Sequence, residues 1–351
     1  MKWTAEMQAA YRTLLKNTRI PHTAYHDARK ELDKAFLKLG TTSFPQCRQL
    51  SGVSRSGKSL LVRDFQTQSP SQRLQEGLIS TIVYACIPPK GTVLGLLENL
   101  LYAMGDPYWE RGSESRKLAR LITLMEKSQC KAIVLDEFQH LVDKGQNRVL
   151  KLTIDFIKSL IEPNKWFLIV SGLPNANRII EQDPQLRNRF PPALTLPRFD
   201  WFDEDLQGEF MGILNAFAQA LHPFDLPELG CEEVAMRFYL ATGGLIGLVT
   251  KILQRAVEDA VDDRRHTIRL QHLGDAFQQE IRFADHYGAI NPFHMKVDAP
   301  SVGQRLKEAS TLVEPDDDDG HVTQAKVHVQ SVTNRKKVTK AAHKQAMAGA
   351  L

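Results

Sequence analysis

Short apolar runs recur between residues 41 and 200 and alternate with longer stretches of helical spacing. The runs cover residues 81–87, 132–135, 167–170 and 194–196. Their length and composition are typical of strands. Because strands that alternate with helices form a parallel sheet with crossover helices, this region is predicted to be an α/β domain. Residues 46–50 give a weaker signal: only Cys47 and Leu50 are apolar, which predicts a half-buried strand.

Helical periodicity dominates on both sides of this region. Residues 204–220, 232–241 and 245–261 have helical spacing, which predicts a small helical part over 201–290. Residues 1–40 are also predicted to be helical. We expect a break near Pro21 and an amphipathic segment over 28–39 that ends at Gly40.

The chain changes character after Asn291-Pro292. Residues 314–320 are strongly acidic, and the basic stretch that follows has few large apolar side chains. Residues from about 295 to 351 are therefore predicted to be largely disordered. This segment is either a solvated tail without function or one that docks a partner or contacts DNA. The sequence thus predicts four regions, namely a helical extension (1–40), an α/β domain (41–200), a helical part (201–290) and a tail (291–351).

The segment Gly-Val-Ser-Arg-Ser-Gly-Lys-Ser at 52–59 matches the phosphate-binding pattern G-x-x-x-x-G-K-[ST] at every fixed position. The glycines let main-chain N–H groups turn toward an anion. Lys58 is expected to reach the β- and γ-phosphates, and the Ser59 hydroxyl to enter a magnesium shell. The alternative is a surface loop that is rich in glycine and serine. The nucleotide-binding residues predicted from the pattern are Gly52, Val53, Ser54, Arg55, Ser56, Gly57, Lys58, Ser59 and Leu60.

Two carboxylates follow the apolar run at 132–135. In open α/β sheets, ligands bind at the carboxyl ends of the strands, which is where Asp136 and Glu137 are expected to lie. Asp136 suits the magnesium shell together with Ser59, and Glu137 suits a base that orients the attacking water. The alternative is a solvated acidic turn. With the phosphate loop upstream, the two segments together predict a site for ATP and Mg²⁺.

Two further segments contain candidate catalytic side chains. Ser171 follows the apolar run at 167–170, and we prefer it to Asn175 as the polar group that contacts the γ-phosphate or the water. Arg187 and Arg189 lie in the segment Leu-Arg-Asn-Arg-Phe, just before Pro191-Pro192. Arg189, with Arg187 as the runner-up, is expected to serve a neighbouring subunit's nucleotide. The alternative is a pair of solvated cations at the end of a helix.

These motifs, in this order, resemble those of an AAA+ ATPase. Within that group the chain resembles the TniB/TnsC proteins of bacterial transposons over roughly residues 20–290. The segment at 130–141, Cys-Lys-Ala-Ile-Val-Leu-Asp-Glu-Phe-Gln-His-Leu, carries this resemblance. So do Ile-Pro-Pro-Lys at 87–90, the apolar helix at 93–101 and Met-Gly-Asp-Pro at 104–107.

The resemblance implies an AAA+ P-loop fold with a helical lid over 201–290. It also implies an ATP-dependent, DNA-binding regulator of transposition that links target-site selection to the transposase. The implied partners are double-stranded DNA bound without sequence preference, copies of the same chain in a ring or filament, a transposase and a TniQ-like target-selection protein. Two alternatives stay open: a loader or initiator ATPase of replication or recombination, and a nucleotide-gated scaffold that does not bind DNA.

One segment departs from the AAA+ pattern. The lid helix begins within Ala-Thr-Gly-Gly-Leu-Ile-Gly-Leu-Val at 241–249, where many relatives carry an arginine that contacts the γ-phosphate. Lys251 and Arg255 lie one and two turns further on. We therefore expect slow hydrolysis of ATP to ADP and phosphate.

The net charge of +4 is unevenly distributed. Residues 321–351 contain six basic and no acidic residues, so +4 minus 6 leaves about −2 for residues 1–320. DNA contact must therefore come from local patches that repeat across subunits. The candidates lie in loops that are expected to face a central channel, although each is also explained as an ordinary solvated cation. They are Lys90, Arg111, Lys117, Lys144 and Arg148, with Arg116 and Arg120 nearby.

The remaining composition is typical of a soluble intracellular protein, and the resemblance implies the bacterial cytoplasm. There is no apolar run of about 18 residues and no apolar stretch of a signal peptide after Met1. The four cysteines are widely separated in or beside apolar stretches, so reduced thiols are expected rather than disulfides or a zinc site. They are Cys47, Cys86, Cys130 and Cys231.

Overall fold

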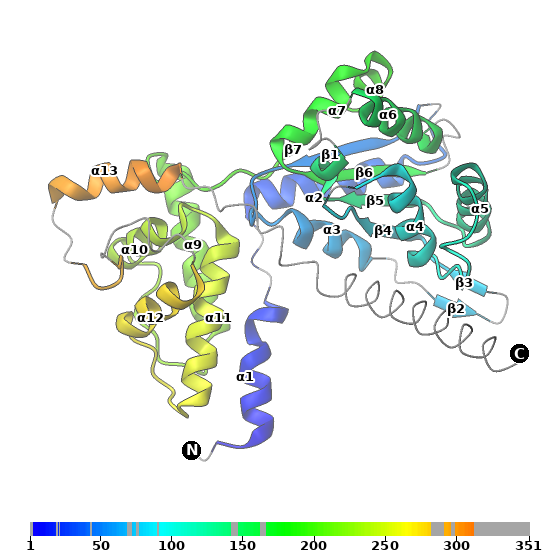
Figure 1. The fold of residues 1–351 in the computed structure, drawn as a ribbon. Coiled ribbons are helices and arrows are strands. Elements are labelled where there is room, and N and C mark those ends of the chain that lie inside the picture. The colour runs from blue at the N-terminus through cyan, green and yellow to red at the C-terminus, as the bar shows by residue number, and fades with distance from the viewer. Residues whose placement is uncertain are drawn as a thin grey trace, which may run out of the picture. The chain divides into compact units, whose positions relative to one another are not determined.

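The computed structural model describes most of the chain between residues 3 and 311 (Figure 1). The described residues are 3–18, 20, 22–42, 44–68, 72–74, 77–89, 91–141, 147–161, 166–281, 291–295 and 299–311. Most of the predicted tail, namely residues 312–351, and the break predicted at Pro21 itself lie outside them.

A five-stranded parallel sheet forms the centre of the α/β region. Its strands are β1 (Cys47–Ser51), β4 (Ile82–Cys86), β5 (Ala132–Asp136), β6 (Phe167–Gly172) and β7 (Leu194–Thr195). They are arranged in the order β4-β5-β6-β1-β7. The predicted fold class is therefore confirmed. A short antiparallel pair, β2 (Gln72–Leu74) and β3 (Gly77–Ile79), was not expected.

Strand β1 is more buried than its sequence predicts. Gln49 and Ser51 are buried together with the apolar Leu50. The reason is position, because β1 pairs with β6 on one side and β7 on the other. The main-chain groups of β1 are therefore hydrogen-bonded within the sheet, and the strand tolerates its two polar side chains.

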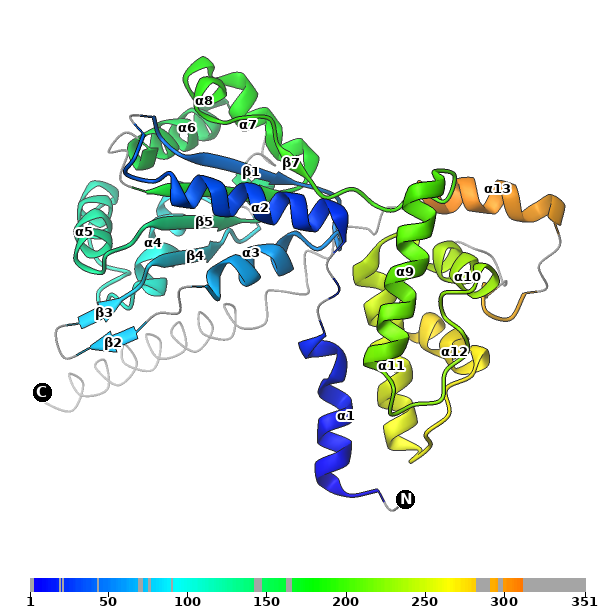
Figure 2. The same cartoon turned by 180° about the vertical axis from the view of Figure 1, so that it is seen from behind.

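Helices cover both faces of the sheet (Figures 1 and 2). Alternate residues of β5 divide between them: Ala132 and Val134 pack on one face, Ile133 and Leu135 on the other. The first face carries α2 (Thr23–Leu37) and α3 (Lys58–Gln66). The second carries α4 (Val93–Ala103), α5 (Glu114–Lys127), α6 (Asn147–Ile161), α7 (Asn177–Gln182) and α8 (Pro184–Arg189).

The helical part has a separate core. It contains α9 (Glu204–Ala220), α10 (Glu232–Thr242), α11 (Ile246–Asp262), α12 (Leu270–Glu280) and α13 (Ala299–Ser310). The first three helices match the predicted ranges within two residues, and α12 was missed. Helix α1 (Ala5–Asn17) packs against α11, whereas α2 packs on the sheet. The two N-terminal helices thus belong to different cores.

Helix α13 corrects the prediction that disorder begins near residue 295. Val302, Leu306 and Ala309 lie at helical spacing and are buried in the core of the helical part. The Arg198 guanidinium also donates a 2.6 Å hydrogen bond to the Ser310 carbonyl. This stripe of three apolar residues is enough because α10 provides a surface for it.

No single helix among the described residues is long and apolar enough to cross a membrane. Within the same residues, α10 and α11 reach that length and composition only as a pair, with a bend of 106° between them.

Candidate active site

The loop between β1 and α3 has the shape that its sequence predicts. Gly57 adopts a left-handed conformation, with φ of 98°, at the start of α3. Gly52 faces a crowded backbone: a Cβ there would lie 2.5 Å from the Leu196 carbonyl oxygen and 2.6 Å from Ser56 Oγ. Both fixed glycines are thus required by the geometry, one for its φ angle and one for the close approach.

Lys58 is buried inside this loop. Its ammonium group donates hydrogen bonds of 2.9 Å and 2.8 Å to the carbonyls of Gly52 and Val53. Burial lowers the pKa of Lys58, and the nearby charges of Glu137 and Asp136 oppose this shift. A buried ammonium that is bonded to neutral carbonyls is placed where an incoming phosphate would gain a charged partner.

The acidic pair lies at the carboxyl end of β5. Asp136 is almost fully buried, and both of its oxygens accept hydrogen bonds of 3.0 Å: Oδ2 from the Tyr84 hydroxyl and Oδ1 from the Glu137 main chain. Burial is the largest cause that raises the Tyr84 pKa, so this hydroxyl stays a donor. The sequence analysis missed Tyr84 because its pairing depends on the register of β4 against β5.

Strand β6 lies between β1 and β5, so its carboxyl end adjoins both motifs. Ser171 is fully buried, and its hydroxyl has no partner among the described residues. The Ser56 hydroxyl of the phosphate loop also has no partner among the described residues. Buried hydroxyls without partners are uncommon in folded proteins and are expected to be satisfied by a bound group.

The residues present fit a magnesium nucleotide. A serine hydroxyl at Ser59 and a carboxylate at Asp136 are the hard oxygen donors that Mg²⁺ prefers. The Asp136 carboxylate has about four lone-pair sites, so it can accept two hydrogen bonds and still face a hydrated cation. Lys58 would supply a cation for the phosphates.

The arginines of α8 lie apart from this loop. Arg187 is exposed, and Arg189 is half-buried with Nη1 unpartnered among the described residues. Burial raises the pKa of Cys47 to about 12, and the charges of Arg189 and Arg48 oppose this shift. Cys47 begins β1, whereas the phosphate loop follows its last residue. The two strand ends are about 13 Å apart at 3.3 Å per residue. Arg189 therefore lies toward the far end of β1 from the chain's own phosphate loop.

Helix α11 approaches the phosphate loop through its main chain. The N–H of Gly247, in the first turn of α11, donates a 3.1 Å hydrogen bond to the Arg55 carbonyl. A Cβ on Gly247 would lie 2.8 Å from that oxygen, so the approach requires glycine. Lys251 donates to the Glu280 carbonyl, and Arg255 pairs with Asp259. The two lid cations are thus engaged within the helical part.

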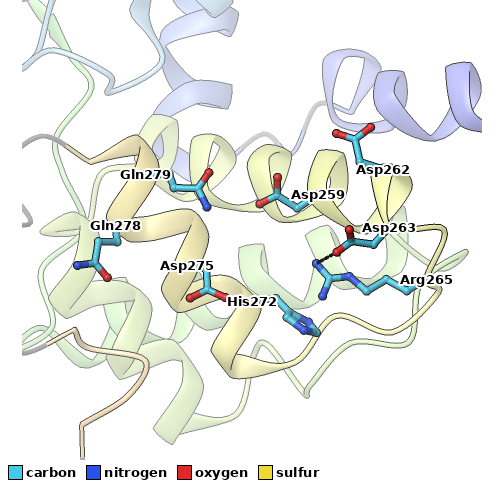
Figure 3. A pocket seen from close by; sticks show the side chains of 8 residues that line it. All are labelled: Asp259, Asp262, Asp263, Arg265, His272, Asp275, Gln278 and Gln279. Atoms are coloured by element: carbon cyan, nitrogen blue, oxygen red, sulfur yellow. Dashed lines mark ion pairs between the residues drawn. The ribbon is translucent and has the colours of Figure 1, made fainter.

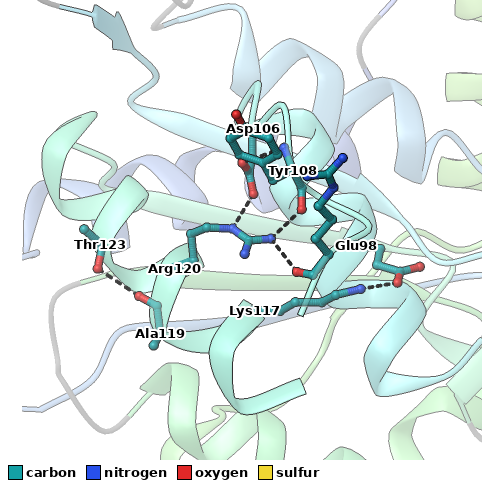
Figure 4. A network of polar contacts seen from close by, with 8 residues as sticks. Glu98, Asp106, Tyr108, Lys117, Ala119, Arg120 and Thr123 are labelled. Carbon is teal, nitrogen blue, oxygen red and sulfur yellow. Dashed lines mark hydrogen bonds and ion pairs between the residues drawn. The ribbon is translucent and has the colours of Figure 1, made fainter. Parts of the chain in front are cut away.

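The predicted DNA contacts fall into three groups, and Figure 4 shows Lys117 and the neighbouring Arg120 among their polar contacts. Arg111 and Arg116 are exposed, and Arg111 lies over the Tyr108 ring at 5.2 Å. Lys117 is buried and paired with Glu98, which corrects its assignment as a surface cation. The neighbouring Arg120 is bound to Asp106 at 2.5 Å. Lys90, Lys144 and the side chain of Arg148 lie outside the described residues.

Two pockets open elsewhere in the described part. The larger, of about 450 Å³, is acidic and unsuited to phosphates (Figure 3). Its lining is Asp259, Asp262, Asp263, Arg265, His272, Asp275, Gln278 and Gln279. The smaller, of about 190 Å³, is lined by His22, Thr23, Ala24, Asp27, Pro197, Arg198, Phe199, Leu206 and Glu209. This smaller pocket lies next to the phosphate loop. The Leu196 carbonyl closely approaches Gly52, and Leu196 directly precedes Pro197, which lines the pocket.

Several solved structures share this fold. The ORC2 protein of Aeropyrum pernix, solved as ADPNP-ADP complexes, is 15% identical with a TM-score of 0.57, covering 92% of this chain and 89% of its own. Cdc6p from Pyrobaculum aerophilum is 16% identical with a TM-score of 0.55, covering 77% and 71%. The ORC1 protein of Aeropyrum pernix in complex with DNA is 16% identical with a TM-score of 0.56, covering 78% and 70%. At these identities the likeness shows the fold alone.

The family comparison is more specific. The model described as "Bacterial TniB protein" matches residues 11–200, more than half of the chain and the whole of the sheet. No curated protein matched the chain. The family resemblance predicted from the motifs is confirmed: this chain belongs to the TniB family and has the fold of an AAA+ ATPase.

Proposed function

We propose that this chain binds ATP with Mg²⁺ and hydrolyses it slowly to ADP and phosphate. Residues 52–60 hold the triphosphate, and Ser59 and Asp136 hold the metal ion. Bound magnesium would neutralise charge on the phosphates. Glu137 orients the attacking water, and Ser171 contacts the γ-phosphate or that water. The observation that carries the proposal is Lys58, whose ammonium is buried in the loop and lies in the field of Asp136 and Glu137.

The smaller pocket supports a place for the nucleotide base. It adjoins the phosphate loop through the segment from Leu196 to Phe199. The engaged lid cations support slow turnover, because neither Lys251 nor Arg255 is free to stabilise charge on the γ-phosphate. In this proposal residues 41–200 form the nucleotide domain and residues 201–290 the lid.

The biological role follows from the family. We propose that ATP drives assembly of this chain into a ring or filament on double-stranded DNA in the bacterial cytoplasm. The assembly would link a TniQ-like target-selection protein to the transposase. Exposed cations such as Arg111 and Arg116 would contact phosphates, which position a protein without reading bases.

The test combines nucleotide binding, turnover and electron microscopy with double-stranded DNA. Lys58→Ala should weaken ATP binding by at least about 10-fold, since a charge-assisted phosphate contact is worth roughly 1.5–3 kcal/mol. It should also abolish assembly on DNA. Glu137→Gln should still bind ATP, lose most turnover and accumulate assemblies on DNA.

Lys127→Ala is the matched control, because this exposed lysine lies at the end of α5. Normal ATP binding by Lys58→Ala would contradict the nucleotide site. ATP-dependent assemblies that form equally well without DNA would favour a scaffold. Loading of another protein complex onto DNA would favour a replication or recombination ATPase.

A further inference from the structure

Gln139 connects the acidic pair to the end of the neighbouring strand. It lies in the 3-10 helix η1 (Phe138–Leu141), which directly follows Glu137. Its side chain is buried, with 4% of the residue exposed. The amide nitrogen donates to the Glu137 carboxylate, and the amide oxygen accepts a 3.1 Å hydrogen bond from the Leu173 N–H. Leu173 is the first residue after β6, so one side chain bridges the ends of β5 and β6.

The two partners fix which way the amide points. An ionised carboxylate can only accept a hydrogen bond, and a main-chain N–H can only donate one. Gln139 therefore has its nitrogen toward Glu137 and its oxygen toward Leu173. A glutamate here would keep the contact with the Leu173 N–H and lose the donor to Glu137. Of the common side chains of this length, glutamine alone satisfies both partners.

The end of β6 is shaped to admit this side chain. A Cβ on Gly172 would lie 2.6 Å from the Gln139 amide oxygen and 3.2 Å from the Phe138 nitrogen. Any side chain at position 172 would therefore push Gln139 from its place. The φ angle of Gly172 is not in the left-handed region, so its lack of a side chain serves this close approach.

Glu137 needs such support because its backbone is strained. Its φ angle is 57°, which is unusual for a residue with a long side chain. Conformations of this kind persist when the surroundings hold them. The Glu137 N–H is held by the Asp136 carboxylate at 3.0 Å, and the Glu137 carboxylate is held by Gln139.

We propose that Gln139 is the positioning residue for Glu137. It holds the carboxylate in the orientation that activates water and ties that orientation to the segment that carries Ser171. A change at the end of β6, such as one caused by contact of Ser171 with the γ-phosphate, thus reaches the base through one side chain. This inference rests on the proposed ATPase function.

The test uses the full chain and separates turnover from binding. Gln139→Met keeps the length and removes both hydrogen bonds. We expect its kcat for ATP to fall about 10- to 100-fold, because displacing a reacting group by about 1 Å costs up to about 100-fold. ATP affinity should change less than about 3-fold, since Gln139 contacts neither the loop nor Lys58. Gln278→Met, at an exposed glutamine of α12, is the control and should retain the parent's kcat.

Gly172 provides a second route to the same result. Gly172→Ala should lower kcat to a similar extent while Gln139 is present. In a Gln139→Ala background, where the obstructed side chain is gone, adding Gly172→Ala should change kcat less than about 2-fold. Gln139→Glu should be as slow as Gln139→Met, although it keeps the contact with Leu173.

The outcomes also separate this inference from the proposed function. If Lys58→Ala abolishes the parent's turnover and Gln139→Met leaves kcat unchanged, the positioning role alone is overturned. Additive effects of Gly172→Ala and Gln139→Ala would overturn it as well. If Gln139→Met lowers ATP affinity and Tm together with kcat, Gln139 has a purely structural role. A parent without Lys58-dependent turnover would remove the proposed function, and this inference with it.

Discussion

Burial decides what each cation of this chain can do. Lys117 and Arg111 are six residues apart, yet one is enclosed beside Glu98 and the other lies in solvent over Tyr108. A buried lysine stabilises the fold through its carboxylate partner, whereas an exposed arginine is available to a phosphate. Both residues carry the same charge in the sequence, so their difference is visible only in the structure.

This difference can be measured on DNA. Arg111→Ala combined with Arg116→Ala should weaken double-stranded DNA binding. It should also lower the slope of log K against log salt by about 1 for each DNA phosphate that the protein no longer neutralises. Lys117→Met should leave that slope unchanged and instead destabilise the fold by about 2 kcal/mol, because it strips Glu98 of its partner. Fluorescence anisotropy over a salt series and thermal melting provide the two readouts. A reduced salt slope in Lys117→Met would contradict the assignment.

The sequence predicts those site residues that lie together in one contiguous motif. It does not predict residues that reach the site from a different strand or helix. The phosphate loop and the pair Asp136-Glu137 are contiguous motifs, and the structure places them at the carboxyl ends of β1 and β5, on either side of β6. Tyr84 and Gln139 act on the same carboxylates from positions set by strand register and by a contact 34 residues away in sequence. No local pattern identifies such partners.

Among the elements, helix α13 was not expected from the sequence. Helix α13 has three buried apolar residues and depends on α10 for its surface. By contrast, α9 begins at an N-cap, Asp203, that precedes two acidic residues and a clear apolar stripe, and its predicted range matches. Helix α2 begins in a less common way, since its N-cap is His22, whose ring nitrogen accepts from the Tyr25 N–H at 3.4 Å.

That histidine cap makes α2 sensitive to acid. Burial lowers the pKa of His22 below 6.5, with Glu209 opposing and His26 reinforcing the shift. Below pH 6.5 the unfolded chain therefore takes up a proton at position 22 more readily than the native chain. The free energy of unfolding accordingly falls as pH is lowered through 6.5 toward the native pKa. A protonated ring also loses the acceptor of the cap, which is worth about 1 kcal/mol.

His22→Asn supplies a cap that does not titrate in this range. Thermal melts of both proteins between pH 7.5 and 5.5 should show the parent losing stability faster than His22→Asn. His272 remains in both proteins, so its own lowered pKa cancels in the comparison. A constant difference in Tm across this range would show that His22 does not cause the acid sensitivity.

At the scale of the whole molecule, the helical part meets the α/β core at the phosphate loop. Gly247 of α11 contacts Arg55 of this loop, whereas the charge of Arg189 acts on Cys47 at the start of β1. This geometry favours the proposal that Arg189 completes the site of a neighbouring subunit.

Mixing two inactive variants tests the shared site. Arg189→Ala should retain ATP affinity within about 3-fold and lose at least about 10-fold in turnover, as expected for an arginine that stabilises transferring phosphate. Lys58→Ala keeps Arg189 and lacks the phosphate contact. Mixed together, the two should regain part of the parent turnover at hybrid interfaces. Arg187→Ala, at the exposed neighbour on α8, tests the alternative arginine and should retain the parent turnover if Arg189 is the residue that acts in trans. If the turnover of the mixture equals the sum of the turnovers of the two variants alone at every mixing ratio, a site built from two chains is contradicted.

The contact between Gly247 and Arg55 is a neutral hydrogen bond between main chains. Dissolved ions screen interactions between exposed charges strongly and affect a contact of this kind little. Phosphate contacts with DNA weaken steeply under the same conditions. Raising the ionic strength should therefore release the proposed DNA contacts while α11 stays joined to the phosphate loop, which allows each interaction to be studied without the other.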